Sequence, residues 1–474
     1  MGTFQIGEAA IGLTPIGAGV RTGWLPEPNV DQDWDLTLDE ARDLAAFQAA
    51  GWEFLPELEI DWGAVRDNNA ASVEAGLLMR HAWGGLVIVR NHVLFRLPPE
   101  IPLPPLGPNV GKLERVPFAK DFVDFHFRLP DRDLESKIHQ QIAFIQALDG
   151  STAAEPLVSY HVVPHGVGVS AKTTGFKQWH WDTIELRTAW NTFGFKGKNV
   201  RVAVIDRGFH PNEPEISPNV TAYVDDTGTH VPGQAIPQRR HGTLCAGLVS
   251  ALDDGNGVHG AAPASSRLLI AVQSVTTQKG VAGAIALAMK GPNGNDGAHV
   301  ITCSLGPTAR PWELSTILQT RIDEAASARA TLGIPIFWAD FNANKPIPST
   351  SVENYGGIVC VGHTDRLDVA APCGNGPGLD LMAPGVGVAT IIRNGANVMV
   401  GLSYGASVAA PSAAGVAALI LSMRPGLTAR QVIEAVLKGC DPPPQPGQPK
   451  IRIDDVRGWG RLNALRAMQI ASTL

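Results

Sequence analysis

Short runs of consecutive apolar residues recur through the second part of the chain, from about residue 180 to the end. The runs lie at residues 199–206, 267–272, 298–304, 334–339 and 357–362. They lack the period-two alternation of a half-exposed strand, and so predict strands buried on both faces of a parallel sheet. Residues 313–328, between two of these runs, carry apolar side chains on one helical face. This alternation predicts a doubly wound α/β domain, whose ligand sites lie at the carboxyl ends of the strands.

The region before residue 165 follows a different pattern, which predicts a separate α+β unit. Residues 135–148 place apolar side chains along one stripe of a helix. Strand-like segments lie at residues 84–97, 122–129 and 155–163. We therefore expect a compact α+β unit over about 84–163, ahead of the parallel sheet.

Small, polar and glycine residues at 166–177 predict a linker. The expected organisation is an N-terminal region over 1–165, the linker, and the α/β domain over 178–474. A length of 474 residues suits two or three domains. In the N-terminal region, a helical pattern covers about 38–50, and residues 1–30, interrupted by Gly and Pro, are expected to be extended or poorly ordered.

The longest nearly apolar stretch, Val408 to Met423, is shorter than the about 20 residues that a membrane-spanning helix needs. Pro411 and Gly415 also interrupt it, so we expect a buried core helix and no membrane span. The first 20 residues lack a basic start followed by a sustained apolar stretch, and so do not resemble a signal peptide. These features favour a cytoplasmic protein, or one secreted without a recognisable signal peptide.

Composition excludes several classes of function. The net charge is −7, so there is no basic excess to bind nucleic acid. The five cysteines form no Cys-x-x-Cys motif, so neither a zinc site nor a disulfide framework can be assigned. No Gly-x-Gly-x-x-Gly motif or P-loop follows a strand, which disfavours a nucleotide-binding protein.

Four polar residues stand at predicted strand ends or helix starts of the α/β domain. Asp206 ends the run VRVAVID, His241 opens the segment HGTLCAG, Asn342 closes ADFN, and Ser407 lies in GASVAAP before an apolar helix. Each has an ordinary structural interpretation: a turn carboxylate, a buried histidine, a turn amide, or a helix N-cap with Ser403 and Ser412 as neighbours. Together they form an Asp, His, Asn, Ser series within one domain.

With VAVIDRG, HGTLCAG and GASVAAP in this order, the chain resembles the subtilisin-like serine proteases, the subtilases. The likeness covers about 180–474 and implies a serine endopeptidase that acts on protein or peptide substrates, with a protein inhibitor as a further potential partner. It implies that Asp206, His241 and Ser407 form the catalytic triad. It also implies that the Asn342 amide stabilises the oxyanion of the tetrahedral intermediate.

The resemblance further implies that Ser304, Leu305 and Gly306 line the cleft and pair with extended substrate. The family's AAGN is ADFN here, which places Phe341 beside Asn342, where its ring could crowd the primary specificity pocket. Cys245 resembles the cysteine of the proteinase-K-like branch, and a buried structural role is the simpler interpretation.

Subtilases commonly carry an inhibitory propeptide, and the α+β unit at 84–163 resembles one, with a cut expected between about 164 and 178. The altered ADFN and GAS segments leave a second hypothesis open, a catalytically weak or silent subtilase fold used as a binding module. Calcium stabilises many members of the family. No cofactor or metal site can be assigned here, because the candidate carboxylates could equally be solvated: Asp225, Asp226, Asp253 and Asp254.

Overall fold

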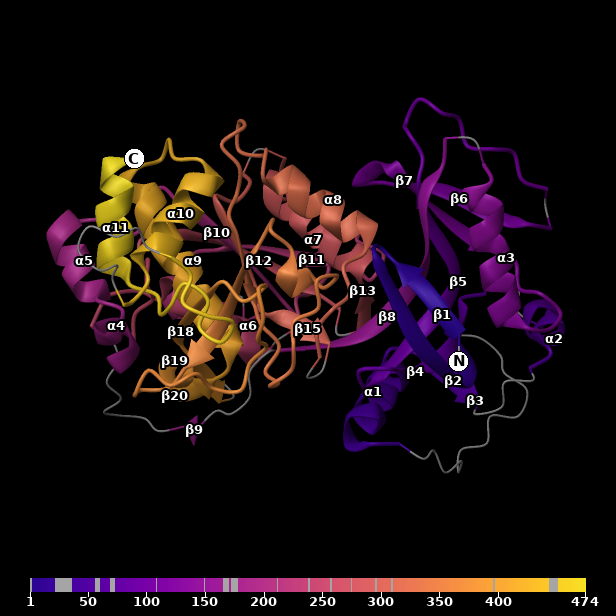
Figure 1. The fold of residues 1–474 in the computed structure, drawn as a ribbon, viewed down its shortest axis with the longest axis horizontal. Coiled ribbons are helices and arrows are strands. Elements are labelled where there is room, and N and C mark those ends of the chain that lie inside the picture. The colour runs from indigo at the N-terminus through magenta and orange to yellow at the C-terminus, as the bar shows by residue number, and fades with distance from the viewer. Residues whose placement is uncertain are drawn as a thin grey trace. The chain divides into compact units, whose positions relative to one another are not determined.

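The chain folds into two compact units in a computed structural model (Figure 1). Unit 1 comprises Met1–Val162, Ser274–Val281 and Glu313–Gln319, and unit 2 comprises Val163–Gln273, Ala282–Trp312 and Thr320–Leu474. The residues that the structure describes are 2–21, 36–55, 60–68, 73–107, 109–148, 150–164, 170–171, 178–210, 212–237, 239–255, 258–273, 275–294, 296–307, 310–394, 397–442 and 451–474.

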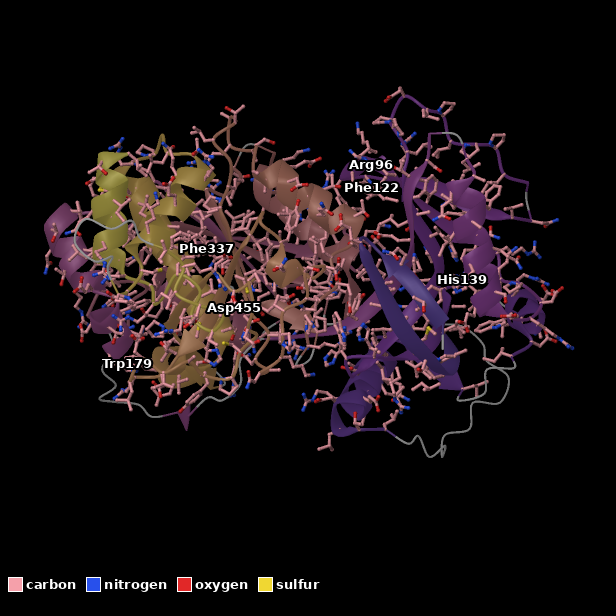
Figure 2. All side chains as sticks on the ribbon, viewed as in Figure 1. Arg96, Phe122, His139, Trp179, Phe337 and Asp455 are labelled. Atoms are coloured by element: carbon pink, nitrogen blue, oxygen red, sulfur yellow. The ribbon has the colours of Figure 1, made fainter. Side chains whose placement is uncertain are left out.

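A parallel sheet forms the centre of unit 2, with strand order β11-β12-β10-β14-β16-β17-β18. Each strand runs parallel to its neighbours. The strands are β10 (Arg201–Asp206), β11 (Val220–Val224), β12 (Ser266–Val272), β14 (Val300–Cys303), β16 (Ile336–Ala339), β17 (Val359–Thr364) and β18 (Leu381–Pro384). Most of their side chains are buried on both faces, and Phe337 of β16 lies within the packed centre of the unit (Figure 2). The prediction of a doubly wound α/β domain is confirmed.

The helices of unit 2 include α4 (Trp179–Thr183), α5 (Leu186–Phe193), α6 (Arg240–Ser250), α9 (Ala406–Met423), α10 (Ala429–Gly439) and α11 (Ala464–Thr473), with short 3-10 helices η1 (Pro214–Ile216) and η2 (Val352–Asn354). Of these, α6 and α9 contact the strands of the sheet, and α10 and α11 pack on α9. The helices α10 and α11 lie side by side (Figure 1). The Thr428 side chain accepts a hydrogen bond from the Gln431 N–H, and this capping box fixes the start of α10.

The helix α9 contacts α6 and the strands β14, β16, β17 and β18. By length and composition it is apolar enough to cross a membrane, but 89% of that stretch is buried inside the protein. A helix that is apolar on all sides and covered on all sides is a core helix. α9 therefore acts as the internal support of unit 2, and its first turn places Ser407 at the sheet.

A small antiparallel sheet joins β9 (Ser170–Ala171), β19 (Val386–Asn394) and β20 (Asn397–Tyr404). Sequence reasoning missed the β19–β20 hairpin, which leads directly into α9 at Gly405. The expected linker at 166–177 lies outside the described residues, except for Ser170–Ala171 in β9.

Unit 1 is built on an antiparallel sheet in the order β1-β2-β4-β5-β7-β6, with β3 beside β2 and β8 beside β5. Its strands are β1 (Gly2–Ile6), β2 (Ala9–Arg21), β3 (Trp52–Leu55), β4 (Ala75–His81), β5 (Leu86–Arg96), β6 (Gly111–Val116), β7 (Ala119–Phe127) and β8 (Thr152–Pro164). Its helices are α1 (Leu38–Ala49), α2 (Trp62–Asp67) and α3 (Leu134–Gln146). The predicted β-α-β element corresponds to β7, α3 and β8.

The first residues of the chain belong to this sheet. Residues 2–21 form the β1–β2 hairpin, the extended alternative of the two expected for the first 30 residues, whereas 22–35 lie outside the described residues. Phe4 of β1 stacks on His139 of α3, with ring centroids 4.6 Å apart (Figure 2 labels His139). The hairpin is thus packed against the helix at the centre of the predicted unit.

Unit 1 also includes two short segments from the second part of the chain, Ser274–Val281 and Glu313–Gln319. In the first, β13 (Val275–Thr277) pairs antiparallel with β8, and Val275 faces His161. The helices α7 (Gln278–Lys290) and α8 (Thr316–Ala325) begin in these segments. Apolar periodicity predicts where strands and helices lie, but not which unit a given turn of helix packs with.

Candidate active site

Asp206 and His241 meet at the carboxyl edge of the parallel sheet. Asp206 is the last residue of β10 and is fully buried, and its Oδ2 lies 2.7 Å from His241 Nδ1. Its Oδ1 accepts a hydrogen bond from the Arg207 N–H at 2.7 Å. Since a carboxylate accepts only, this contact places a proton on Nδ1 and leaves Nε2 of the neutral ring as the acceptor.

The start of α6 brings His241 to this position, and two glycines allow it. A Cβ on Gly242 would stand 2.2 Å from the Gly208 carbonyl oxygen, so the helix approaches the turn after β10 more closely than any other residue permits. Gly208 itself has φ +147°, a backbone region that favours glycine. The glycines of VAVIDRG and HGTLCAG therefore set the distance between the carboxylate and the imidazole.

Ser407 lies in the first turn of α9. It directly follows Ala406, which in turn follows the N-cap residue Gly405, whose φ is 115°. Its Oγ is buried, as is His241 Nε2, and neither atom hydrogen-bonds with any described residue. Hydrogen bonds between a nucleophile and its base are often long in substrate-free enzymes and shorten when substrate binds. Within the described part of the chain, Oγ of the candidate nucleophile and Nε2 of the candidate base are therefore free of other hydrogen bonds.

Pro411 has a role that sequence reasoning missed. It lies four residues after Ser407 and has no N–H, so the Ser407 carbonyl lacks its helical donor. That carbonyl instead accepts from Ser304 Oγ at 3.1 Å and from Cys245 Sγ at 3.3 Å. The signal in the sequence was a proline one helical turn after the candidate nucleophile. These two hydrogen bonds connect α9 with α6 and with the end of β14 next to Ser407.

Asn342 follows β16 and lies beside the start of α9. The Ala406 N–H donates to its Oδ1 at 2.9 Å, which identifies the oxygen of the carboxamide because only the oxygen can accept. The Nδ2 group must then point away from Ala406. Because Ala406 directly precedes Ser407, the amide donor is fixed next to the candidate nucleophile.

Comparison with known proteins decides the family. Residues 197–459, more than half of the chain, match the model of the subtilase family. The chain belongs to the subtilase family. It is 33% identical over 247 residues to subtilisin of Bacillus pumilus, which covers 50% of this chain and 82% of that protein. The same identity and length hold for subtilisin E of Bacillus subtilis, of which the match covers 60%. The family match and these relatives identify the chain as a subtilisin-like serine endopeptidase.

Two solved structures share the subtilase fold. Fervidolysin from Fervidobacterium pennivorans, described as a keratinolytic enzyme related to subtilisin, matches with a TM-score of 0.61 and 19% identity over 80% of this chain and 61% of that one. A protease of Pseudoalteromonas arctica matches with a TM-score of 0.52 and 26% identity, over 62% of this chain and 97% of that one. The likeness to fervidolysin shows the fold alone, and it extends over more of the chain than the family model does.

The residues expected to line the subtilase cleft are well packed here. Ser304 is buried and bonded to the Ser407 carbonyl, while Leu305 and Gly306 lie in the short strand β15 (Leu305–Pro307). Phe341 is fully buried, with its ring in a cluster formed by Ile347, Cys360, Cys373, Leu379 and Met382. The roles of these residues toward substrate stay predictions.

Metal-capable groups come together at one described place, where oxygen, nitrogen and sulfur atoms of Asp206, His241 and Cys245 lie within 4.8 Å of one another. These are the hydrogen-bonded Asp206–His241 pair and a thiol, not the set of hard oxygen ligands that calcium prefers. Elsewhere, Asp225 Oδ1 accepts the N–H groups of Thr227 and Thr229, and Asp253 pairs with Lys196. Two of the four carboxylates considered for calcium thus have partners within the protein, and calcium binding stays a prediction.

Cys245 is a neutral thiol that should resist modification. Burial, and then the nearby Asp206 carboxylate, raise the pKa of the Cys245 thiol well above its ordinary value. All five cysteines of the chain are free and buried. We expect Ellman's reagent to titrate almost no thiols in the native protein at pH 8 and five after denaturation in guanidinium.

A contrary result would be one fast-reacting native thiol that disappears in Cys245→Ala and whose modification stops hydrolysis. That result would give Cys245 a regulatory role in place of a packing role. Cys440→Ala is the matched control, because Cys440 is also buried and donates to a helical carbonyl, that of Val436.

Proposed function

We propose that the chain hydrolyses peptide bonds in protein substrates through an acyl-enzyme on Ser407. His241 Nε2 takes the proton from Ser407 Oγ as the oxygen bonds to the substrate carbonyl carbon. The same proton passes to the leaving amine when the C–N bond breaks. Water, deprotonated by His241, then releases the acyl group and restores Ser407.

Several groups stabilise charge in this proposal. Asp206 holds the imidazole with Nδ1 protonated and balances the imidazolium that forms. The Asn342 amide and the Ser407 backbone N–H donate to the oxyanion of each tetrahedral intermediate. The first turn of α9 adds unsatisfied N–H groups and the positive end of its dipole near the same point.

The observation that carries this proposal is the 2.7 Å contact between Asp206 and His241, with Ser407 and Asn342 joined beside it through Ala406. The alternative, a silent subtilase fold that only binds peptides, rests on the altered ADFN segment and the unbonded Ser407 Oγ. An assay with casein distinguishes the two functions. Hydrolysis by the wild type and not by Ser407→Ala supports the protease, whereas binding of casein without hydrolysis supports the peptide-binding module.

The N-terminal region is proposed as an inhibitory unit, so that the chain is made as a zymogen. Support comes from the segments around β13 and the start of α8, which pack within unit 1. Tyr160 of β8 faces Thr276 in an antiparallel pairing. Lys279 Nζ lies 2.6 Å from Asp124 Oδ2, and His81 Nε2 lies 2.6 Å from Glu313 Oε1, with both side chains of the second pair buried.

A buried polar contact such as that between His81 and Glu313 is costly to separate, because each group left alone in the interior would lack a partner. The Glu155 carboxyl, also buried, accepts the Gly7 N–H at 2.6 Å and the Thr316 N–H at 3.2 Å, so it joins the first hairpin to the start of α8. These contacts place the two later segments with the N-terminal residues in one compact unit, as a folded propeptide-like unit requires. The proposed cut at 164–178 falls almost wholly outside the described residues.

We expect the purified wild-type chain to cut itself between residues 164 and 178, the segment that joins the N-terminal region to the catalytic domain. Ser407→Ala should remain a single chain of 50.2 kDa, since it lacks the nucleophile. Intact-mass spectrometry over a time course measures both. A fully active wild type that stays intact would refute obligatory processing, and equal cutting of the two proteins would point to another protease.

A further inference from the structure

The segment that carries Asn342 departs from the family at two neighbouring positions. Where the family has AAGN, this chain has Ala339, Asp340, Phe341 and Asn342. Asp340 and Phe341 are both fully buried. A carboxyl group and a phenyl ring in place of small residues need partners inside the protein, and the structure provides them.

The Asp340 side chain accepts hydrogen bonds at the turn after β16. The Gly374 N–H donates to its Oδ2, and the Phe341 N–H also contacts the carboxyl group. The Asp340 N–H donates to the Val361 carbonyl of β17 at 3.1 Å. Its Oδ1 is buried and hydrogen-bonds with no described group. One residue therefore connects the end of β16, the strand β17 and the loop at Gly374.

Gly374 fits against both altered residues. A Cβ at this position would stand 2.6 Å from Asp340 Oδ1 and 2.8 Å from Phe341 Cζ. The absence of a side chain on Gly374 thus lets its N–H reach the carboxyl group while the phenyl ring fills the space alongside. Asp340, Phe341 and Gly374 form one matched set.

Further bonds join the same two loops beyond this set. The Ile347 N–H donates to the Asn375 carbonyl at 2.8 Å, and the Asn375 N–H donates to the Lys345 carbonyl at 3.1 Å. At the other end, the Ala406 N–H holds Asn342 Oδ1. Asn342 therefore lies between a backbone donor on one side and a turn anchored by Asp340 on the other.

We propose that Asp340 is a positioning residue for Asn342, and that the hydrogen bond from the Gly374 N–H to its carboxyl group fixes the turn that aims the oxyanion donor. This inference rests on the serine-protease mechanism proposed above. Asp340 itself touches neither substrate nor the reacting atoms. Its effect on catalysis passes through Asn342 alone.

The charge environment favours the neutral acid form of Asp340. Burial, and then the nearby carboxylate of Glu353 in η2, raise the pKa of the Asp340 carboxyl well above its ordinary 3.8. Among the described residues, the thiols of Cys360 on β17 and of Cys373 also face it, and burial raises the pKa of each, that of Cys373 to about 12. A neutral carboxyl can still accept from Gly374, so Asp340→Asn should preserve the function and Asp340→Ala should not.

A double-mutant cycle tests the proposal. Asp340→Ala should lower kcat about 10- to 100-fold with KM nearly unchanged, because a small misplacement of a transition-state donor costs rate without costing ground-state binding. In an Asn342→Ala background the same change should cost less than about 2-fold. Asp340→Asn should restore kcat to within about 3-fold of wild type.

Two outcomes would overturn the proposal. One is wild-type kcat in Asp340→Ala, and the other is an equal loss with and without Asn342. Asp380→Asn is the control, since Asp380 is a partly buried carboxyl that also accepts a backbone N–H, that of Cys360 at 2.8 Å. It should change thermal stability but not kcat. The mechanism itself fails only if Ser407→Ala stays active, so the two failures are distinguishable.

If Asp340→Ala does not fold, the pH dependence of kcat in Asp340→Asn, compared with that of the wild type, tests the proposal. A carboxyl whose pKa is raised by folding loses stabilisation as pH rises above 3.8 toward the raised pKa, because the unfolded chain gives up its proton first. Ionisation beside Glu353 should then disturb the turn once the pH exceeds the raised pKa of Asp340. We expect kcat to decline at lower pH in the wild type than in Asp340→Asn, and identical profiles would overturn the proposal.

Discussion

Ser407→Ala is expected to lower kcat for peptide hydrolysis about a million-fold, the size of the loss that removing the nucleophile causes in subtilisin itself. Without Oγ no acyl-enzyme can form, and the Asp206–His241 pair has no hydroxyl to activate. Substrate binding should change little, because the Ser407 side chain is buried and bonded to no described group. Initial rates on a chromogenic peptide, with active protein quantified by mass, measure the change.

Ser412→Ala is the matched control. Ser412 lies one turn further along α9, is also buried, and its Oγ donates to the Val408 carbonyl at 2.9 Å. Its loss should leave kcat within a few-fold of wild type. Full activity in Ser407→Ala, or loss of activity in Ser412→Ala alone, would place the nucleophile elsewhere and contradict the account.

Asn342→Ala is expected to lower kcat about 10²- to 10³-fold, equivalent to about 2.7–4 kcal/mol, as the loss of such a donor does in subtilisin itself. The amide donates to a negative oxygen that exists only in the transition state and the tetrahedral intermediate. KM should therefore stay nearly constant while kcat falls. Steady-state kinetics on one peptide substrate separate the two parameters.

Asn344→Ala serves as the control for this experiment, because Asn344 lies on the same loop, is exposed, and contacts only the Asn375 amide among the bonds described for its side chain. We expect it to change kcat less than about 3-fold, as exposed polar contacts contribute little. A rise in KM with unchanged kcat in Asn342→Ala would assign that amide to substrate binding and not to the oxyanion.

The sequence predicted the sheet and the polar residues at its edge because both depend on local pattern. Buried parallel strands appear as uninterrupted apolar runs, which located β10, β12, β14, β16 and β17 within a few residues. The hairpin of β19 and β20 and the edge strands β11 and β18 were missed. Glycines that allow close approach, such as Gly242, stand next to the residues they position. The motifs around Asp206, His241 and Ser407 could therefore be recognised in the sequence.

Other features depend on contacts between distant residues, and no local pattern encodes those. The bonds from Ser304 and Cys245 to the Ser407 carbonyl need three elements in register, although Pro411 was a visible signal. Asp340 and Gly374 are 34 residues apart, and only the fold makes them a pair. The packing of the segment around β13 with β8 is of the same kind.

The most direct test of the catalytic account is covalent labelling of the purified wild-type protein with a fluorophosphonate probe, followed by peptide mapping. The probe phosphonylates a serine only where a base activates the hydroxyl and an oxyanion site accepts the phosphoryl oxygen. We predict one adduct, on Ser407, that is absent from Ser407→Ala and slowed in Asn342→Ala. An adduct on another serine, or no adduct on a folded and processed wild-type protein, would contradict the account.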